Sequence, residues 1–164
     1  MKKYELTDET IEVYGTALHR IKALKDFGNV KKGELGGYVE SERNLSQEGN
    51  CWVFGNAKVC GNAKVYGNAW VYGNAEVCGN AEVCGKAEVF GKADYITIKG
   101  LGSKYRNTTI FRTKENIAVK CGCFYGTLAE FVDKVKETHG NSKFAKEYLA
   151  LIDLVKIHFE LEDK

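Results

Sequence analysis

Few residues of this 164-residue chain have side chains suited to catalysis or metal binding. Its histidines are His19, His139 and His158, and none lies between Gly49 and Ile96. His19 falls in a segment of alternating polar and apolar residues, where a histidine is more often a packed or exposed strand residue than a catalyst. The sequence also lacks a phosphate-binding loop, a nucleophile elbow and an HExxH pattern. We therefore expect no enzymatic activity, no metal site and no cofactor.

The six cysteines are the other reactive side chains. Cys60 and Cys78 are 18 residues apart and share a position with aromatic residues, which is typical of small apolar surface residues; a metal site or disulfide is the alternative. Cys121 and Cys123 lack the second pair that a zinc site needs, so we expect a buried strand position. No apolar run is long enough to span a membrane, and Met1 leads into polar sequence. These features predict a cytoplasmic protein with reduced thiols and no membrane partner.

The most regular part of the sequence is a six-residue unit that occurs eight times without a gap from Gly49 to Ile96. Each unit has a glycine, then Asn or Lys, then a small residue, and two positions later one apolar anchor. Because side chains of an extended segment alternate between two faces, the anchor points inward and its neighbours outward. Glycine followed by asparagine accepts the positive φ of a corner every six residues. This period predicts a solenoid and not a disordered tract. The anchors are Val53, Val59, Val65, Val71, Val77, Val83, Val89 and Tyr95.

These units resemble those of the hexapeptide-repeat proteins, whose fold is a left-handed parallel β-helix. In that family three hexads close one triangular coil, so the resemblance implies 18 residues per turn. Val39 and Leu45 look like two earlier rungs, with a two-residue irregularity before Val53. The predicted fold class is mainly β: a left-handed parallel β-helix with an N-terminal β cap and a C-terminal α+β module that ends in a two-helix hairpin.

A closer resemblance covers most of the chain. The runs LKDFGNVKKGELGGYVESERNLSQEGNCWVFGNAKV and CGCFYGTLAEF are similar to a group of phage and prophage hexapeptide-repeat proteins. The resemblance indicates a lineage more than a function. Some small phage proteins of this kind act against host defence systems, and we consider the same role for this chain by analogy.

With 18 residues per turn, the aromatic residues of the repeat fall in two neighbouring columns on one face. One column is Trp52, Trp70 and Glu88, and the other is Phe54, Tyr72 and Phe90. A monomer seldom leaves so large an apolar patch uncovered. Three covers remain open: another subunit, the chain's own terminal segments, or a ligand or partner. Because the resembled proteins commonly form trimers with parallel coils, we favour a homotrimer.

The other two faces pair Lys58 with Glu76 and Lys64 with Glu82. Charges of opposite sign one strand apart help to fix the register and indicate no chemistry.

Both ends of a short solenoid require caps. Residues 1–38 read as short strands that form the first cap, residues 39–96 as the repeat, and residues 97–164 as the C-terminal module. The expected strands cover residues 3–6, 10–14, 16–24, 95–99, 107–113 and 117–124, with a turn at residues 114–116. Thr127 and Glu130 form a capping box for a helix that ends at Gly140, and Ser142 caps a second amphipathic helix.

The start of the C-terminal module is basic, with six cationic residues against the single acid Glu115. Such a strip suits an anionic partner; a solvated hairpin face is the simpler alternative. If the strip binds a partner, reversing its arginines weakens binding without lowering thermal stability. The basic residues are Lys99, Lys104, Arg106, Arg112, Lys114 and Lys120.

The function that we expect is non-enzymatic binding. Enzymes of the resembled fold use a histidine on the coil as general base for acyl transfer, or bind zinc through coil histidines, and this repeat has none. The expected partners are a second copy of the chain and a host protein or anionic nucleotide signal, which would make the protein an inhibitor of antiviral defence. The alternatives are an unusual acyltransferase, using Glu76, Glu82 or Glu88 as base, and a virion or scaffold component.

Overall fold

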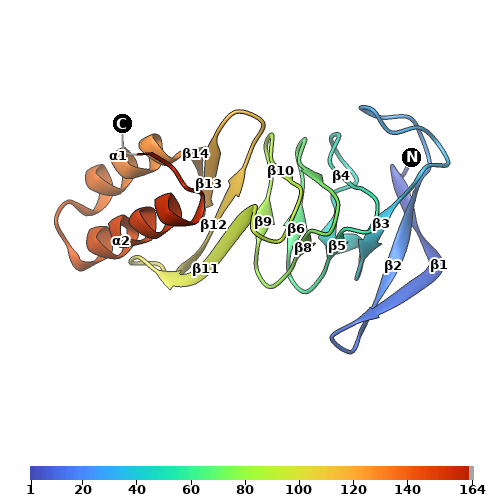
Figure 1. The fold of residues 1–164 in the computed structure, drawn as a ribbon, viewed down its shortest axis with the longest axis horizontal. Helices are drawn as coiled ribbons and strands as arrows, with labels where there is room; N and C mark the ends of the chain where they lie inside the picture. The colour runs from blue at the N-terminus through green and yellow to red at the C-terminus, as the bar shows by residue number, and fades with distance from the viewer. Residues whose placement is uncertain (163–164) are drawn as a thin grey trace.

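The computed structural model describes residues 1–162. The molecule is elongated, with an N-terminal hairpin, the repeat and a C-terminal sheet with two helices following one another along its length (Figure 1). It is mainly β with two C-terminal helices, as the sequence predicted. Within the described residues the strands form four separate sheets, and none closes on itself. No helix in residues 1–162 is long and apolar enough to cross a bilayer.

Each of the first seven hexads of the repeat contributes a two-residue strand, and the strands pair in parallel with partners 18 residues away. Trp52 pairs with Trp70 and Lys58 with Glu76, which is the predicted register. The strands are β4 (Trp52–Val53), β5 (Lys58–Val59), β6 (Lys64–Val65), β7 (Trp70–Val71), β8 (Glu76–Val77), β9 (Glu82–Val83) and β10 (Glu88–Val89). We refer to each stretch of 18 residues as a lap.

The seven valine anchors are all buried, at most 1% exposed, and form the core of the repeat. At the corners the glycines have positive φ, and backbones of successive laps pass so closely that a Cβ on Gly49 would lie 2.4 Å from the carbonyl oxygen of Gly67. The eighth hexad departs from the prediction, because Gly91 has no positive φ and Tyr95 already begins β11 (Tyr95–Leu101).

The two earlier rungs are confirmed. Val39, in β3 (Leu35–Val39), pairs with Val59, and Leu45 pairs with Val65, each 20 residues apart, so two extra residues precede Val53 as predicted. The 3-10 turn η1 (Glu42–Asn44) lies between these rungs.

The N-terminal residues extend the same sheet. β1 (Tyr4–Val13) and β2 (Thr16–Ala23) form an antiparallel hairpin, and β2 pairs with β3. The two short strands expected over residues 3–14 are one strand with an irregularity between Leu6 and Thr10.

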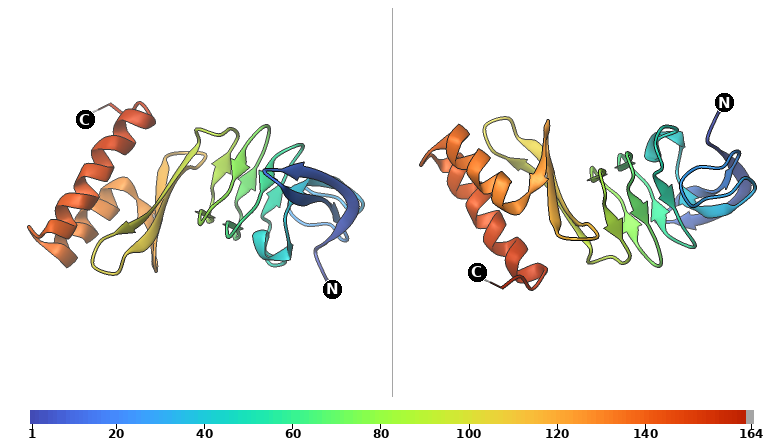
Figure 2. Two further views of the ribbon diagram at one scale, coloured as in Figure 1. Left: turned by 90° about the horizontal axis from the view of Figure 1, so that it is seen from below. Right: turned by 90° about the horizontal axis from the view of Figure 1, so that it is seen from above.

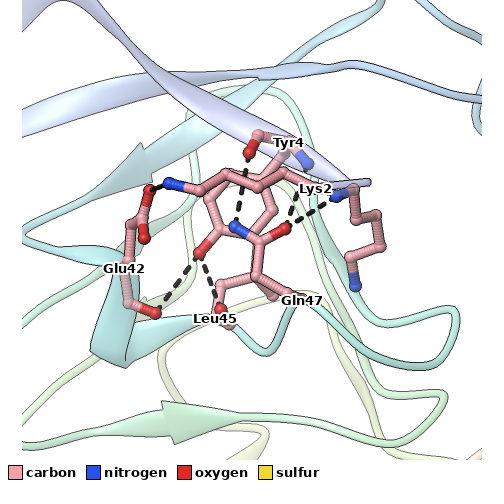
Figure 3. Close-up of polar contacts among 6 residues, drawn as sticks. Lys2, Tyr4, Glu42, Leu45 and Gln47 are labelled. Carbon is pink, nitrogen blue, oxygen red and sulfur yellow. Dashed lines mark hydrogen bonds and ion pairs between the residues drawn. The ribbon is translucent and has the colours of Figure 1, made fainter.

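Polar contacts attach this segment to the first lap (Figure 3). Gln47 Oε1 accepts hydrogen bonds from the backbone N–H groups of Lys3 (2.8 Å) and Tyr4 (3.3 Å). The hydroxyl of Tyr4 donates to the carbonyl of Leu45 (2.6 Å), and Lys2 forms an ion pair with Glu42 (2.7 Å).

The C-terminal module is a four-stranded antiparallel meander followed by two helices. The remaining elements are β12 (Arg106–Arg112), β13 (Ile117–Cys121), β14 (Phe124–Thr127), α1 (Leu128–His139) and α2 (Lys143–His158). The helix caps are as predicted: Thr127 accepts from the N–H of Glu130, and Ser142 from that of Ala145. The strand expected over residues 117–124 is interrupted at Gly122, whose φ is 58°. Both helices lie on the side of this sheet that faces away from the repeat (Figure 2).

The other side of this sheet caps the last lap, because its polar side chains bond to open backbone groups of the repeat. Tyr95 donates its hydroxyl to the carbonyl of Glu76 (2.7 Å) and accepts from the N–H of Cys78 (3.3 Å). Thr109 Oγ1 accepts from the N–H of Glu82 (3.0 Å). Asn107 Nδ2 donates to the carbonyl of Asn80 (2.7 Å).

Candidate interaction surfaces

Four aromatic side chains of three successive laps form one contiguous surface. Phe54 stacks on Tyr72 at 4.8 Å with planes 14° apart, and Tyr72 stacks on Phe90 at 4.4 Å and 6°. Trp70 contacts both Phe54 and Tyr72 edge-on, at 5.9 Å in each case. We call Phe54, Trp70, Tyr72 and Phe90 the aromatic surface. The column of Phe54, Tyr72 and Phe90 is the one that the sequence predicted.

Trp52 was expected in this surface and is not part of it. Its side chain is fully buried, because Tyr4 and Phe27 cover it edge-on at 6.1 and 5.3 Å. Gly36 lies against the same indole, where a Cβ would come 2.8 Å from it. The chain's own N-terminal segment therefore covers the first rung of the predicted face and leaves the later rungs open.

Exposure increases along the aromatic surface toward the C-terminal module. Phe54, Trp70 and Tyr72 are half-buried, whereas Phe90 is 54% exposed. Because the column is stacked ring on ring, it presents ring edges to the solvent, and edges pack favourably against the faces of other rings. Burial, with a contribution from Glu88, raises the pKa of Tyr72 to about 12, so its phenol is neutral near pH 7.

The structure does not bring the six predicted basic residues together on one face. Lys99 lies opposite Asn107, and Lys120 opposite Thr109, on the side of the sheet that bonds to the repeat. Lys114 is in the turn between β12 and β13. Because successive strand residues point to opposite faces, the arginines of β12 fall on the other side, toward the helices. The six residues therefore do not form one strip, because the arginines of β12 and the residues that pair with Lys99 and Lys120 alternate along the same strand.

Arg112 has a structural role. Its Nε is 3.0 Å from Asp94 Oδ1, its backbone N–H donates to the carbonyl of Asp94 (2.9 Å), and its guanidinium lies 5.0 Å from the centre of the Phe159 ring. Arg106 and Lys104 lie elsewhere, at an open cavity between the sheet and α1, together with Lys134. The predicted pair Arg106 and Arg112 is thus divided between a cavity rim and a packed contact.

None of the histidines lies on the repeat. His19 Nδ1 is 3.2 Å from the carbonyl of Thr7, His158 Nε2 is 2.8 Å from that of Ala93, and the imidazole of His139 stacks on Tyr148. Within residues 1–162 no three histidine, cysteine or acidic side chains gather closely enough to hold a metal ion.

All six cysteines are free thiols in the structure. Burial, with a smaller contribution from Cys78, raises the pKa of Cys60 to about 11. Cys84 is buried where an outward position was expected, and of the CGC pair Cys121 is buried while Cys123 is exposed. The predicted ladder of Lys58 on Glu76 is present in the register, although Glu76 forms its ion pair with Lys92 (3.4 Å).

Comparisons with known proteins give one similarity of note. No family model matches the chain. The chain is 39% identical over 62 residues to the uncharacterized acetyltransferase YdcK of Escherichia coli K12, which covers 33% of this chain and 19% of that protein. The match thus spans less than a fifth of the relative's length, and it fits a hexapeptide-repeat protein.

Proposed function

We propose that this protein is a non-enzymatic binding protein that associates with copies of itself through the aromatic surface. The single observation that carries the proposal is the continuous stack of Phe54, Tyr72 and Phe90, which remains open after the chain's own N-terminal segment has covered Trp52.

The repeat is proposed to wind as a left-handed parallel β-helix. Three features support this winding: parallel pairing at 18 residues, a buried valine in each of seven successive units, and a glycine of positive φ at successive corners. In such a helix the side chains one lap apart lie in register, so that a flat column of rings extends along one edge of the molecule.

A second copy is the occupant that best suits this surface. The four side chains form one contiguous, partly exposed apolar patch, and such patches on soluble proteins commonly mark interaction sites. The same column on a parallel copy supplies rings of the same spacing, and a closed ring of three copies gives every protomer the same contact. We therefore propose a homotrimer.

The C-terminal module is proposed to meet the partner. Its candidate cationic residues are the rim residues Lys104 and Arg106, because Arg112 is engaged by Asp94. In the phage setting that the sequence resembles, the proposed partner is a host protein or a nucleotide signal of an antiviral defence system.

An acyltransferase is the second candidate function, and the similarity to YdcK favours it. It would need a base other than histidine on the repeat, and Glu76, Glu82 and Glu88 are the carboxylates available there. Incubation of the purified protein with acetyl-coenzyme A and amine acceptors separates the two candidates. Turnover that is lost on replacing one of these glutamates by glutamine would overturn the non-enzymatic proposal.

The self-association is tested by measuring molar mass by light scattering for the natural protein and for a Trp70→Glu/Tyr72→Glu variant. We expect three times the protomer mass of 18.3 kDa for the natural protein and the protomer mass for the variant, because two charges would be buried without partners. Lys64→Gln, exposed on another face, is the control and should keep the full mass. A double variant of unchanged mass would remove the aromatic surface from the contact.

A further inference from the structure

The C-terminal module contains a cavity of about 260 Å³ at the end of α1, where four segments converge. The connection between β11 and β12 supplies Lys104, the start of β12 supplies Arg106, and the turn between β13 and β14 supplies Cys123. The helices supply Lys134 from α1 and Tyr148 from α2. The cavity is on the helix side of the sheet, away from the repeat and the aromatic surface.

Aromatic side chains form the wall of this cavity. Phe131 contacts Phe124 at 5.3 Å and Tyr148 edge-on at 5.4 Å, and the imidazole of His139 stacks on Tyr148 at 5.8 Å with planes 26° apart. A wall of this kind accommodates a planar ring.

Two turn glycines allow the polar side chains to reach their positions. A Cβ on Gly122 would lie 2.5 Å from a terminal nitrogen of Arg106, and one on Gly102 would lie 2.2 Å from the hydroxyl of Tyr148. Both glycines have positive φ, 58° and 75°. The Arg106 guanidinium thus lies directly on the turn that carries Cys123, at the cavity rim.

The charge at the rim is of one sign. Among the described residues, the cavity is lined by three cations, Lys104, Arg106 and Lys134, and by no carboxylate. In the part of the chain that the structure describes, neither Lys104 nor Arg106 forms an ion pair. The carboxylate of Glu147, next to Tyr148 in sequence, accepts from the N–H of Gly102 (2.9 Å).

We infer that this cavity binds a small aromatic molecule that carries a phosphate group, of the size of a mononucleotide. The ring lies against the wall of Phe124, Phe131 and Tyr148, and the phosphate is bound by Lys104 and Arg106. Several cations together favour a dianion over a single carboxylate, and a guanidinium binds phosphate oxygens in pairs. Tyr148, whose pKa is raised by burial and by its contact with Cys121, remains a neutral phenol beside the ring.

This inference rests on the proposed role of the C-terminal module as the partner-binding part, and it can fail without the self-association failing. The self-association is read by molar mass, whereas the cavity is read by ligand-dependent thermal stability and by the reactivity of Cys123. Cys123 is the one exposed cysteine of the described residues, and it lines the cavity, so an occupant should protect it from alkylation.

The experiment uses the full chain with adenosine 5′-monophosphate, adenosine and inorganic phosphate as separate probes. Adenosine monophosphate should raise the Tm with increasing concentration and slow the alkylation of Cys123, measured peptide by peptide by mass spectrometry. Adenosine alone or inorganic phosphate alone should have a much smaller effect.

Two variants test the assignment of residues. Lys104→Gln/Arg106→Gln should weaken the effect of the nucleotide about tenfold or more, because charge-assisted hydrogen bonds are lost. Thr138→Trp, at an exposed position that lines the cavity, should block entry without changing the charge. Lys99→Gln, on the opposite side of the sheet, is the matched control and should bind normally.

No effect of the nucleotide at millimolar concentration would overturn the inference. An effect that persists in both variants would do the same. Inorganic phosphate or adenosine acting as strongly as the nucleotide would show a site for that fragment alone and would contradict the combined ligand.

Discussion

At the scale of single residues, Lys3 has the least ordinary environment in the protein. Its side chain is fully buried, and its ammonium nitrogen lies 2.9 Å from the carbonyl of Cys51 and 3.2 Å from that residue's Sγ. The ring of Phe27 is 5.0 Å away. The carbonyls of the first lap and this ring replace the carboxylate that a buried cation usually has.

The burial of Lys3 predicts that the stability of the protein depends on pH. Burial lowers the pKa of Lys3 from the 10.5 of the free side chain, so between the two values the unfolded chain binds more protons than the folded one. The free energy of unfolding therefore increases with pH through this window. Compared with Lys3→Met, the natural protein should gain stability as the pH rises toward 10.5 in urea titrations. A difference between the two proteins that stays constant with pH would contradict this reading.

The hydroxyl of Tyr95 allows the contribution of the C-terminal cap to stability to be measured. Tyr95→Phe leaves the carbonyl of Glu76 and the N–H of Cys78 without their partner at the end of the repeat. We expect a loss of about 1–3 kcal/mol in the free energy of unfolding, measured by denaturant titration. Tyr105→Phe, at a tyrosine that is 68% exposed, should change stability little. Equal effects of the two changes would show that the hydroxyl of Tyr95 does not stabilise the cap.

At the scale of elements, Trp52 and Trp70 lie one lap apart in different environments. Replacing each of them tests protomer stability separately from self-association. Trp52→Ala removes a fully buried indole and should cost about 3–5 kcal/mol in the free energy of unfolding. Trp70→Ala, on the open surface, should have a smaller effect on the unfolding of the protomer and should weaken self-association. Calorimetry with light scattering checks both, and the reverse pattern would contradict the placement of these side chains.

Arg112 belongs to the packing between the sheet and the C-terminal end of α2. Arg112→Glu should lower the free energy of unfolding by about 1 kcal/mol, because it loses Asp94 and the Phe159 ring. Arg106→Glu should leave stability nearly unchanged. From the sequence we expected that reversing the charge of either arginine would not lower thermal stability. The structure predicts a loss for Arg112, and thermal melts of the two variants test this difference.

The repeat could be predicted from the sequence in detail because its period is local. A valine every six residues fixes which side chains are buried, and the glycines fix the corners. The 18-residue turn that the resemblance to hexapeptide-repeat proteins implies then places Trp70, Tyr72 and Phe90 on one face. The burial of Trp52 could not be predicted, because nothing in residues 1–38 indicates over which face they fold. Nor could the division of the basic residues, since it depends on the cross-strand register, which places Lys99 opposite Asn107 and Lys120 opposite Thr109. The cavity forms from segments far apart in sequence and has no local pattern.

At the scale of the whole molecule, one core continues from the N-terminal segment through the repeat to the side of the C-terminal sheet that faces the repeat. Tyr4, the valine anchors and Phe111 belong to it. A second core lies between the sheet and the helices and contains Val119, Phe131 and Tyr148. The repeat thus separates the N-terminal segment, which covers the first lap, from the C-terminal module, which contains the cavity. The aromatic surface runs along the repeat, so the proposed side-by-side association would leave the module free.

The central claim is that the aromatic surface is covered by another copy of the chain. Hydroxyl-radical footprinting of the purified protein, at high concentration and after dilution, tests it most directly because it reads side-chain accessibility residue by residue. We expect Phe90, 54% exposed in the protomer, to be protected at high concentration and to become reactive on dilution. Tyr14 and Tyr105, which are 86% and 68% exposed, should react equally at both concentrations. A Phe90 that is as reactive as these two tyrosines at every concentration would contradict the account.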